Sequence, residues 1–262
     1  MTLSIAIHGA AGRMGKRLVA LGSADHDLKI VAALETREHP QLGHDVGTLA
    51  GIGPLGVPIS ASLDLPADAV IDFSVPAAFE PLLELCLARR LPLVVATTGL
   101  SSEQIERIRQ AAATIPLVWA PSMSLAVNLT MKLTEQAAKV LADKDADVEI
   151  IERHHRFKED APSGTALKFG QIIAAQMGQT TAVHGRQGRP GRRPHGEIGY
   201  HAVRVGDNPG EHTIIFGMLG ETIELTVRAS NRDCYAVGAL AAAKFVAKQP
   251  PGLYNMNDVL GL

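Results

Sequence analysis

Apolar and polar positions alternate in blocks through the first half of this 262-residue chain. Short apolar runs rich in β-branched residues, which are typical of buried strands, occupy 3–7, 28–34, 69–73, 93–96 and 117–119. Segments with helical periodicity follow them at 16–21, 76–90 and about 101–113. Repeated β-α units of this length predict an α/β fold with a doubly wound parallel sheet, which binds ligands beyond the carboxyl ends of its strands.

The pattern changes after about residue 126. A long helix over about 127–141 leads to an apolar strand at 148–151, and later segments alternate as strands do. In these segments Val203 and Val205 share one face, and Ile223, Leu225 and Val227 share another. Turn residues at 208–210 and 219–220 then predict an antiparallel meander. Because few helices are expected to cover it, we predict an open sheet face that contacts another subunit.

A glycine turn lies between the first apolar run and the first helix. Gly9, Gly12 and Gly15 let the backbone turn tightly and approach a pyrophosphate, which the helix N-terminus stabilises. Glu35 ends the second strand, where a carboxylate can accept hydrogen bonds from the adenosine ribose. This context predicts a Rossmann-type site for NADH or NADPH, although a turn needed only for helix–sheet packing has the same pattern. The candidate cofactor-binding residues are Gly9, Ala10, Ala11, Gly12, Arg13, Met14, Glu35, Thr36, Arg37, Phe73, Ala96, Thr97, Thr98, Ala120, Pro121, Ser122 and Met123.

Two adjacent histidines and a lysine follow the strand at 148–151. The strand delivers His154 and His155 to its carboxyl end, and Lys158 lies three residues beyond them. An acid/base group beside a fixed cation suits chemistry on a small carboxylate. The alternative is a strand–loop–helix segment whose histidines are simply solvated.

A helix start comes directly after this segment. Ser163 can cap the following helix, which leaves the amides of Gly164 and Thr165 unpaired and pointing outward. Such a helix end can bind an anion such as a substrate carboxylate. The histidines, the lysine and this helix start together predict a site for a small carboxylate.

Composition narrows the function classes. Lys plus Arg is 25 and Asp plus Glu is 27, so the net charge of −2 argues against a general nucleic-acid or membrane partner. Cys86 and Cys234 are too few for a disulfide framework, and no Cys/His spacing indicates a metal. With no signal peptide or membrane span recognisable, we expect a cytoplasmic protein. A Gly/Pro-rich loop over 184–196 carries four arginines, which are either solvated or hold an anion.

Together these residues strongly resemble the dihydrodipicolinate reductases of the lysine/diaminopimelate pathway. The block Glu-x-His-His-x-x-Lys-x-Asp-Ala-Pro-Ser-Gly-Thr-Ala over 152–166 is highly specific to that family, and the resemblance extends from the glycine turn to 258–260. It implies a homotetramer with two domains. Residues 1–126 with 235–262 would bind the dinucleotide, and residues 127–234 would form a smaller mixed α/β domain for substrate binding and tetramerisation.

The resemblance also implies a reaction, the NAD(P)H-dependent reduction of a cyclic dicarboxylate imine to tetrahydrodipicolinate. By matching position, His154 is similar to the family's proton donor, and Lys158 to a second proton donor or carboxylate anchor. The implied substrate-binding residues are His155, Ser163, Gly164 and Thr165. No metal is required for this chemistry.

Some positions depart from the family pattern. Ala96 stands where glycine is usual, and Pro121-Ser-Met123 replaces a more common arrangement, so we expect an effect on cofactor affinity. Thr36 follows Glu35 where some members carry arginine, and Arg37 comes one residue later. These residues leave the choice between NADH and NADPH open.

Two other function classes share part of the pattern. Another two-domain amino-acid dehydrogenase, acting on aspartate or a semialdehyde, would need the glycine turn but not the His-His-x-x-Lys block. A non-catalytic NAD-binding regulator would need a DNA-reading element or a basic face. The basic cluster found in this sequence lies in the Gly/Pro-rich loop at 184–196.

Overall fold

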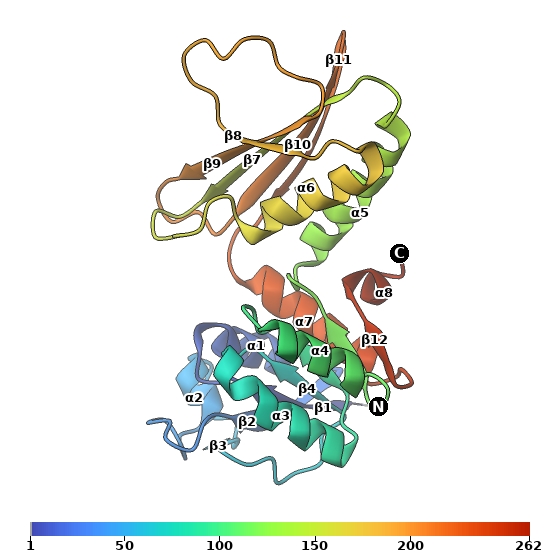
Figure 1. Cartoon of the computed structure of the whole chain (residues 1–262). Coiled ribbons are helices and arrows are strands. Elements are labelled where there is room, and N and C mark those ends of the chain that lie inside the picture. The colour runs from blue at the N-terminus through green and yellow to red at the C-terminus, as the bar shows by residue number, and fades with distance from the viewer. Residues whose placement is uncertain (1) are drawn as a thin grey trace. The chain divides into compact units, whose positions relative to one another are not determined.

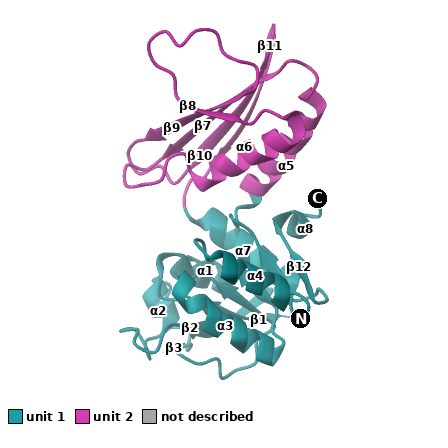
Figure 2. Cartoon of the chain, viewed as in Figure 1, with its two compact units in different colours: residues 1–125, 232–262 teal, residues 126–231 magenta. Residues whose placement is uncertain are grey.

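The computed structural model describes residues 2–262, which form two compact units (Figures 1 and 2). Unit 1 contains the chain up to residue 125 together with 232–262, and unit 2 is the continuous stretch 126–231. Unit 2 is therefore an insertion within unit 1. In the described part of the chain, no helix combines the length and apolar character needed to cross a membrane.

Unit 1 contains a parallel sheet of seven strands in the order β12-β6-β5-β4-β1-β2-β3. The strands are β1 (Leu3–His8), β2 (Leu28–Leu34), β3 (Ile59–Ser60), β4 (Ala69–Asp72), β5 (Leu93–Val95), β6 (Pro116–Trp119) and β12 (Gly252–Tyr254). The predicted doubly wound α/β fold is confirmed. Four short elements of unit 1 were not predicted, namely β3, β12, helix α2 (Val46–Ala50) and helix α8 (Met256–Leu260), because two to five residues carry too little periodicity.

Helices cover both faces of this sheet, because successive side chains of a buried strand point to opposite sides. On one face, Ile5 and Ile7 of β1 belong to a core with α1 (Arg13–Ala24) and α7 (Asp233–Val246). On the other, Ala6 of β1 belongs to a core with α3 (Pro76–Arg89) and α4 (Ser102–Ala111). The final helix, α8 (Met256–Leu260), follows β12.

Unit 2 contains a mixed sheet of five strands in the order β11-β10-β7-β9-β8. The strands are β7 (Asp147–His154), β8 (Thr181–His184), β9 (Glu197–Arg204), β10 (Glu211–Met218) and β11 (Glu221–Arg228). Helices α5 (Leu125–Leu141) and α6 (Gly164–Met177) lie across one face and share its core (Figure 1).

The predicted antiparallel meander is wrong for half of this sheet. Only β10 and β11 form a hairpin of consecutive strands, while β9 pairs in parallel with both β7 and β8. Because β7 lies between β9 and β10, the strand that carries the histidines occupies the centre of the sheet. Pairing between strands far apart in sequence leaves no mark on local periodicity, so the alternation alone could not reveal it.

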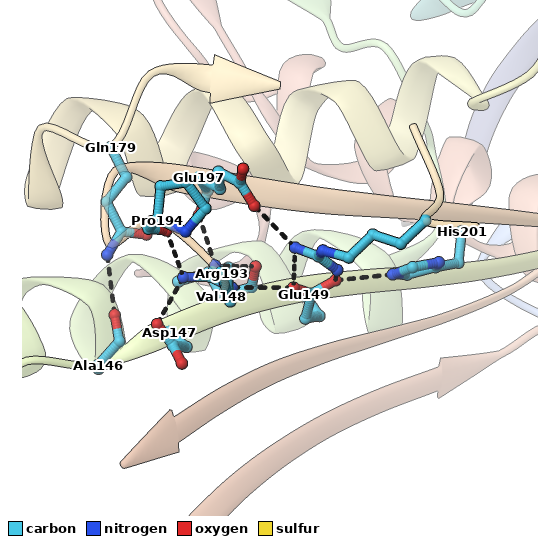
Figure 3. A network of polar contacts seen from close by, with 10 residues as sticks. Ala146, Asp147, Val148, Glu149, Gln179, Arg193, Pro194, Glu197 and His201 are labelled. Carbon is cyan, nitrogen blue, oxygen red and sulfur yellow. Dashed lines mark hydrogen bonds and ion pairs between the residues drawn. The ribbon is translucent and has the colours of Figure 1, made fainter. Parts of the chain in front are cut away.

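The loop between β8 and β9 is held to the sheet by arginines (Figure 3). Glu149 on β7 accepts hydrogen bonds from Arg186, Arg193 and His201, and Arg193 also pairs with Asp147 at 2.5 Å. Burial raises the pKa of Glu149, but the bonds from Arg186, His201 and Arg193 outweigh it and lower the pKa to about 2. Two of the four loop arginines are thus engaged by carboxylates of unit 2.

Candidate functional site

The two predicted catalytic residues lie at and just beyond the carboxyl end of β7. Alternation along this strand puts Glu152 and His154 on the face covered by α5 and α6, where they are 1% and 8% exposed. His154 Nδ1 lies 2.5 Å from Glu152 Oε2. Burial lowers the pKa of His154, and the positive charges of Lys158 and Arg204 lower it further, whereas Glu152 opposes the shift.

Lys158 follows in the loop after β7. Its ammonium donates to both carboxylate oxygens of Asp160, at 2.7 and 2.9 Å, and this bond lowers the pKa of Asp160. The Asp160 side chain is mostly exposed, so it can turn to solvent if another anion takes the ammonium. His155 packs beside Phe157, and its Nδ1 is buried without a hydrogen-bond partner among the described residues.

The start of α6 has the capping geometry that the sequence predicted. Ser163 Oγ accepts from Ala166 N at 3.2 Å and lies 3.0 Å from His212 Nε2. Within residues 2–262 the amides of Gly164 and Thr165, at the first turn of α6, have no hydrogen-bond acceptor. Burial lowers the pKa of His212 to about 4, and the neighbouring His154 contributes in the same direction. Near neutral pH His212 is therefore an uncharged partner of the capping serine.

The glycine turn of unit 1 brings several predicted cofactor residues together. Gly9 has φ +78°, and a Cβ there would lie 2.5 Å from Phe73 O, so only glycine fits. Gly12 begins α1 without a side-chain cap, and the first turn of α1 holds no acidic residue. Ala11 N donates to Glu35 Oε1 at 2.8 Å. The helix end is thus open to an anion, and the carboxylate stands beside it.

A buried carboxylate joins the loops around this turn. Asp72, at the end of β4, accepts from Thr97 Oγ1 at 2.8 Å and from Ser74 Oγ at 2.6 Å, and its Oδ1 lies 2.8 Å from His8 Nδ1. These contacts connect the carboxyl ends of β1, β4 and β5, where ligands of such sheets bind. Asp72 was not among the predicted site residues, because in the sequence it is an ordinary strand end.

The other predicted cofactor residues differ in what they can offer. The side chains of Ala10, Ala96, Ala120 and Met123 are buried in the core of unit 1, so their contacts with a ligand would run through backbone atoms. Thr36 and Arg37 follow β2 directly. Among the described residues, no group of three or more His, Cys, Asp or Glu side chains is arranged to hold a metal ion.

Family models match both halves of the chain. The model described as dihydrodipicolinate reductase, N-terminus, matches residues 3–123, and the C-terminus model matches residues 126–260. The chain belongs to the dihydrodipicolinate reductase family. A 4-hydroxy-tetrahydrodipicolinate reductase from Rhodopirellula baltica is 59% identical over 99% of this chain and 96% of its own. One from Alkalilimnicola ehrlichii is 49% identical over the full length of both chains.

A solved structure supports the same assignment. The dipicolinate-bound dihydrodipicolinate reductase from Paenisporosarcina sp. TG-14 superposes with a TM-score of 0.78 at 27% identity. The match covers 97% of this chain and 98% of that one.

Three polar residues around His154 were not among the predicted site residues. They are Glu152, Arg204 and His212, which come from β7, β9 and β10. One signal was available, because Glu152 lies two positions before His154 and so shares its face of the strand. Arg204 and His212 join the cluster only through the pairing of distant strands.

Proposed function

We propose that this chain catalyses the NAD(P)H-dependent reduction of 4-hydroxy-tetrahydrodipicolinate (dihydrodipicolinate) to tetrahydrodipicolinate, a step of lysine and diaminopimelate biosynthesis. The family match over residues 3–123 and 126–260 carries this proposal, since both domains of the reductase are present. The names of the full-length relatives and the buried His154 beside Lys158 support it.

The glycine turn of unit 1 fits a dinucleotide. Gly9 lets the backbone approach Phe73, and the uncapped start of α1 suits a pyrophosphate. Glu35 would receive the ribose hydroxyls, sharing its carboxylate with Ala11 N. The 4-hydroxy substrate has to lose its hydroxyl group and a ring hydrogen as water, which leaves the conjugated dihydrodipicolinate. When bound, the reduced nicotinamide would supply a hydride with its electron pair to this ring, and the product must then gain one proton.

Unit 2 supplies the groups that a dicarboxylate needs. The amides of Gly164 and Thr165 at the start of α6 can bind one carboxylate, with Ser163 capping the helix below them. Lys158 can bind a carboxylate by releasing Asp160, and its backbone N–H donates to the carbonyl of His155, three residues earlier. The dipicolinate-bound relative supports a ligand of this class.

His154 is the proton donor in this proposal. In the protonated state its Nε2 gives a proton to the reduced ring, while Nδ1 stays on Glu152. The imidazole is left neutral and regains its proton from solvent. Glu152 favours the imidazolium, because a carboxylate beside an imidazole stabilises its positive charge.

The homotetramer and the cytoplasmic location belong to the same proposal. The sheet of unit 2 has α5 and α6 on one face, and its other face carries Ile151, Val203 and Ile215 along neighbouring strands. Val203 is 39% exposed, which suits burial against another copy of the chain. Sedimentation equilibrium of the full chain tests the assembly, and a monomer at micromolar concentration would contradict it.

The activity is tested with the condensation product of pyruvate and aspartate semialdehyde. We expect NADH and NADPH to be oxidised, and this is measured as the loss of reduced-nicotinamide absorbance. Aspartate, and aspartate semialdehyde with phosphate, each supplied with NAD⁺ or NADP⁺, distinguish the other dehydrogenases, because those enzymes oxidise these substrates. Turnover of one of those substrates, with none of the condensation product, would contradict the proposal.

Replacement of His154 by Gln tests its role as the proton donor. We expect kcat to fall by about 10²- to 10⁴-fold, the usual contribution of a positioned acid. Coenzyme binding by unit 1, measured by fluorescence titration, should not change, because His154 lies in unit 2. Unchanged turnover in His154→Gln over the neutral pH range would remove this residue from catalysis.

A further inference from the structure

Glu152 is the most buried charged side chain around His154, and its two oxygens accept four hydrogen bonds. Oε2 receives His154 Nδ1 at 2.5 Å and Arg204 Nη1 at 2.8 Å, while Oε1 receives Arg204 Nη2 at 2.7 Å and Ser163 N at 3.0 Å. Burial raises the pKa of Glu152, but the bonds from Arg204 and His154 outweigh it and the pKa lies below its ordinary value. Glu152 is therefore an anion with its acceptor positions occupied.

These bonds connect three parts of the candidate site. His154 ends β7, Arg204 ends β9, and Ser163 caps α6, whose first amides have no acceptor. Arg204 Nη2 also donates to Asp160 O at 2.6 Å in the loop that carries Lys158. A single carboxylate thus links the histidine, the lysine loop and the helix start.

The bond to Glu152 also determines which nitrogen of His154 faces outward. A carboxylate anion can only accept, so Nδ1 carries the hydrogen, and Nε2 is the nitrogen left for other partners. Next to Nε2 lies Gly210, which has φ +152°, and a Cβ built there would be 3.0 Å from this nitrogen. Glycine therefore keeps the space at Nε2 clear of a side chain.

We propose that Glu152 is a positioning residue, which holds His154 with Nδ1–H on its carboxylate and Nε2 toward the substrate, and ties this orientation to the start of α6. The inference rests on the proposed reductase function for its catalytic consequence. Its structural content, the tautomer of His154, stands independently of the substrate.

Exchange of Glu152 for Gln isolates this role. The amide oxygen can still accept the two hydrogen bonds of Oε1, from Ser163 N and Arg204 Nη2. The NH₂ group then faces His154 and donates to Nδ1, which moves the hydrogen of neutral His154 to Nε2. The charged groups left around His154 are Lys158 and Arg204, which are both positive, and the neighbouring ring of His212 is largely uncharged. The imidazolium therefore loses its one stabilising anion.

Two consequences are measurable in Glu152→Gln. We expect kcat to fall by about 10²- to 10⁴-fold with a smaller change in KM, as when a catalytic histidine is held in the wrong tautomer. A required imidazolium disappears as pH rises through its pKa, so a lower pKa moves the decline of activity to lower pH. A role in folding alone would leave the pH profile where it is.

The matched control is Glu149→Gln. Glu149 lies on the same strand, and its carboxylate likewise accepts from guanidinium groups and a histidine, here Arg186, Arg193 and His201 (Figure 3). The alternation of β7 puts it on the opposite face of the sheet from His154. We expect this variant to keep the parent's pH profile and kcat. If both variants shift the pH profile equally, the shift does not depend on contact with His154, and the proposal is wrong.

A second measurement separates this inference from the proposed function. Nitrogen-15 NMR of histidine-labelled protein reports which ring nitrogen of His154 carries the hydrogen, with His154→Gln used to assign the signal. We expect Nδ1–H in the parent and Nε2–H in Glu152→Gln, even if the chain reduces a different substrate. Should Glu152→Gln fail to fold, the parent spectrum decides, because Nε2–H in the neutral parent would overturn the proposal.

Discussion

In the proposed function, Lys158 binds a substrate anion while the neighbouring carboxylate of Asp160 competes for its charge. Its ammonium is held at 2.7 Å by Asp160, an exposed group that pays little for returning to water. An incoming carboxylate can therefore replace Asp160 without leaving a buried charge unpaired. Lys158 can therefore exchange the carboxylate of Asp160 for that of a substrate.

Substitution of Lys158 by Ala should remove this anchor. We expect kcat/KM to fall by roughly 10- to 150-fold, about 1.5–3 kcal/mol, because a charge-assisted hydrogen bond is lost. Inhibition by pyridine-2,6-dicarboxylate should weaken as well. Asp160→Asn is the matched variant, since it frees the ammonium and should keep or improve that inhibition. Equal inhibition of Lys158→Ala and the parent would exclude the anchor.

We predict that coenzyme preference depends on a second charged residue, Glu35. Its carboxylate lies on Ala11 N, where it can accept both ribose hydroxyls of NADH but repels the 2′-phosphate of NADPH. Arg37 can offset part of this repulsion. We expect dual use with a tilt toward NADH of about fivefold, roughly 1 kcal/mol, since solvent screens these charges. An NADPH preference of about tenfold that shrinks with added salt, seen in KM values, would reverse this interpretation.

Individual elements could be predicted from the sequence where their pattern is local. The apolar run at 28–34 became β2 with the same bounds, and Ser163 caps α6 as its residue type indicates. The position of β7 between β9 and β10 could not be predicted, because it depends on the pairing of distant strands. For the same reason Arg204 and His212 were not predicted as site residues. Both are nevertheless connected by hydrogen bonds to the predicted residue Ser163: His212 directly, and Arg204 through Glu152.

At the junction of β1 and α1, two glycines allow an effect on packing to be distinguished from an effect on ligand binding. A Cβ at Gly15 would overlap Gly9 O and lie 2.5 Å from Ala10 Cα, whereas at Gly12 the nearest atom is 3.2 Å away. We expect Gly15→Ala to destabilise unit 1 by about 1–3 kcal/mol or more, because backbone atoms cannot move aside easily. Gly12→Ala should fold and bind NADH more weakly. Thermal unfolding and coenzyme titration of both variants check this, and equal stability would contradict it.

The molecule as a whole carries a buried neutral histidine whose titration makes stability depend on pH. His212 has a folded-state pKa of about 4, below the value near 6.5 of an unfolded chain. Between these values the unfolded state binds more protons, so the free energy of unfolding falls as pH falls from about 6.5 to about 4. The lowered pKa of His154 acts in the same direction.

Urea unfolding at a series of pH values measures this effect. We expect His212 to contribute up to about 3 kcal/mol of acid destabilisation, from a shift of roughly 2.5 units at 1.36 kcal/mol each. His212→Gln cannot titrate but can still bond to Ser163 Oγ, so its stability should change less between pH 6.5 and 4. An identical pH dependence in the variant and the parent would show that His212 contributes nothing.

The insertion of unit 2 within unit 1 has a consequence for synthesis on the ribosome. Helix α7 packs in the core of unit 1, and β12 pairs with β6, yet both are translated after all of unit 2. Unit 2 is continuous, so its sheet can close while the chain is still growing. Unit 1 cannot be completed before 232–262 is translated, and during that interval the β6 edge and the apolar surface that α7 covers lack their partners, which makes the growing chain prone to aggregation.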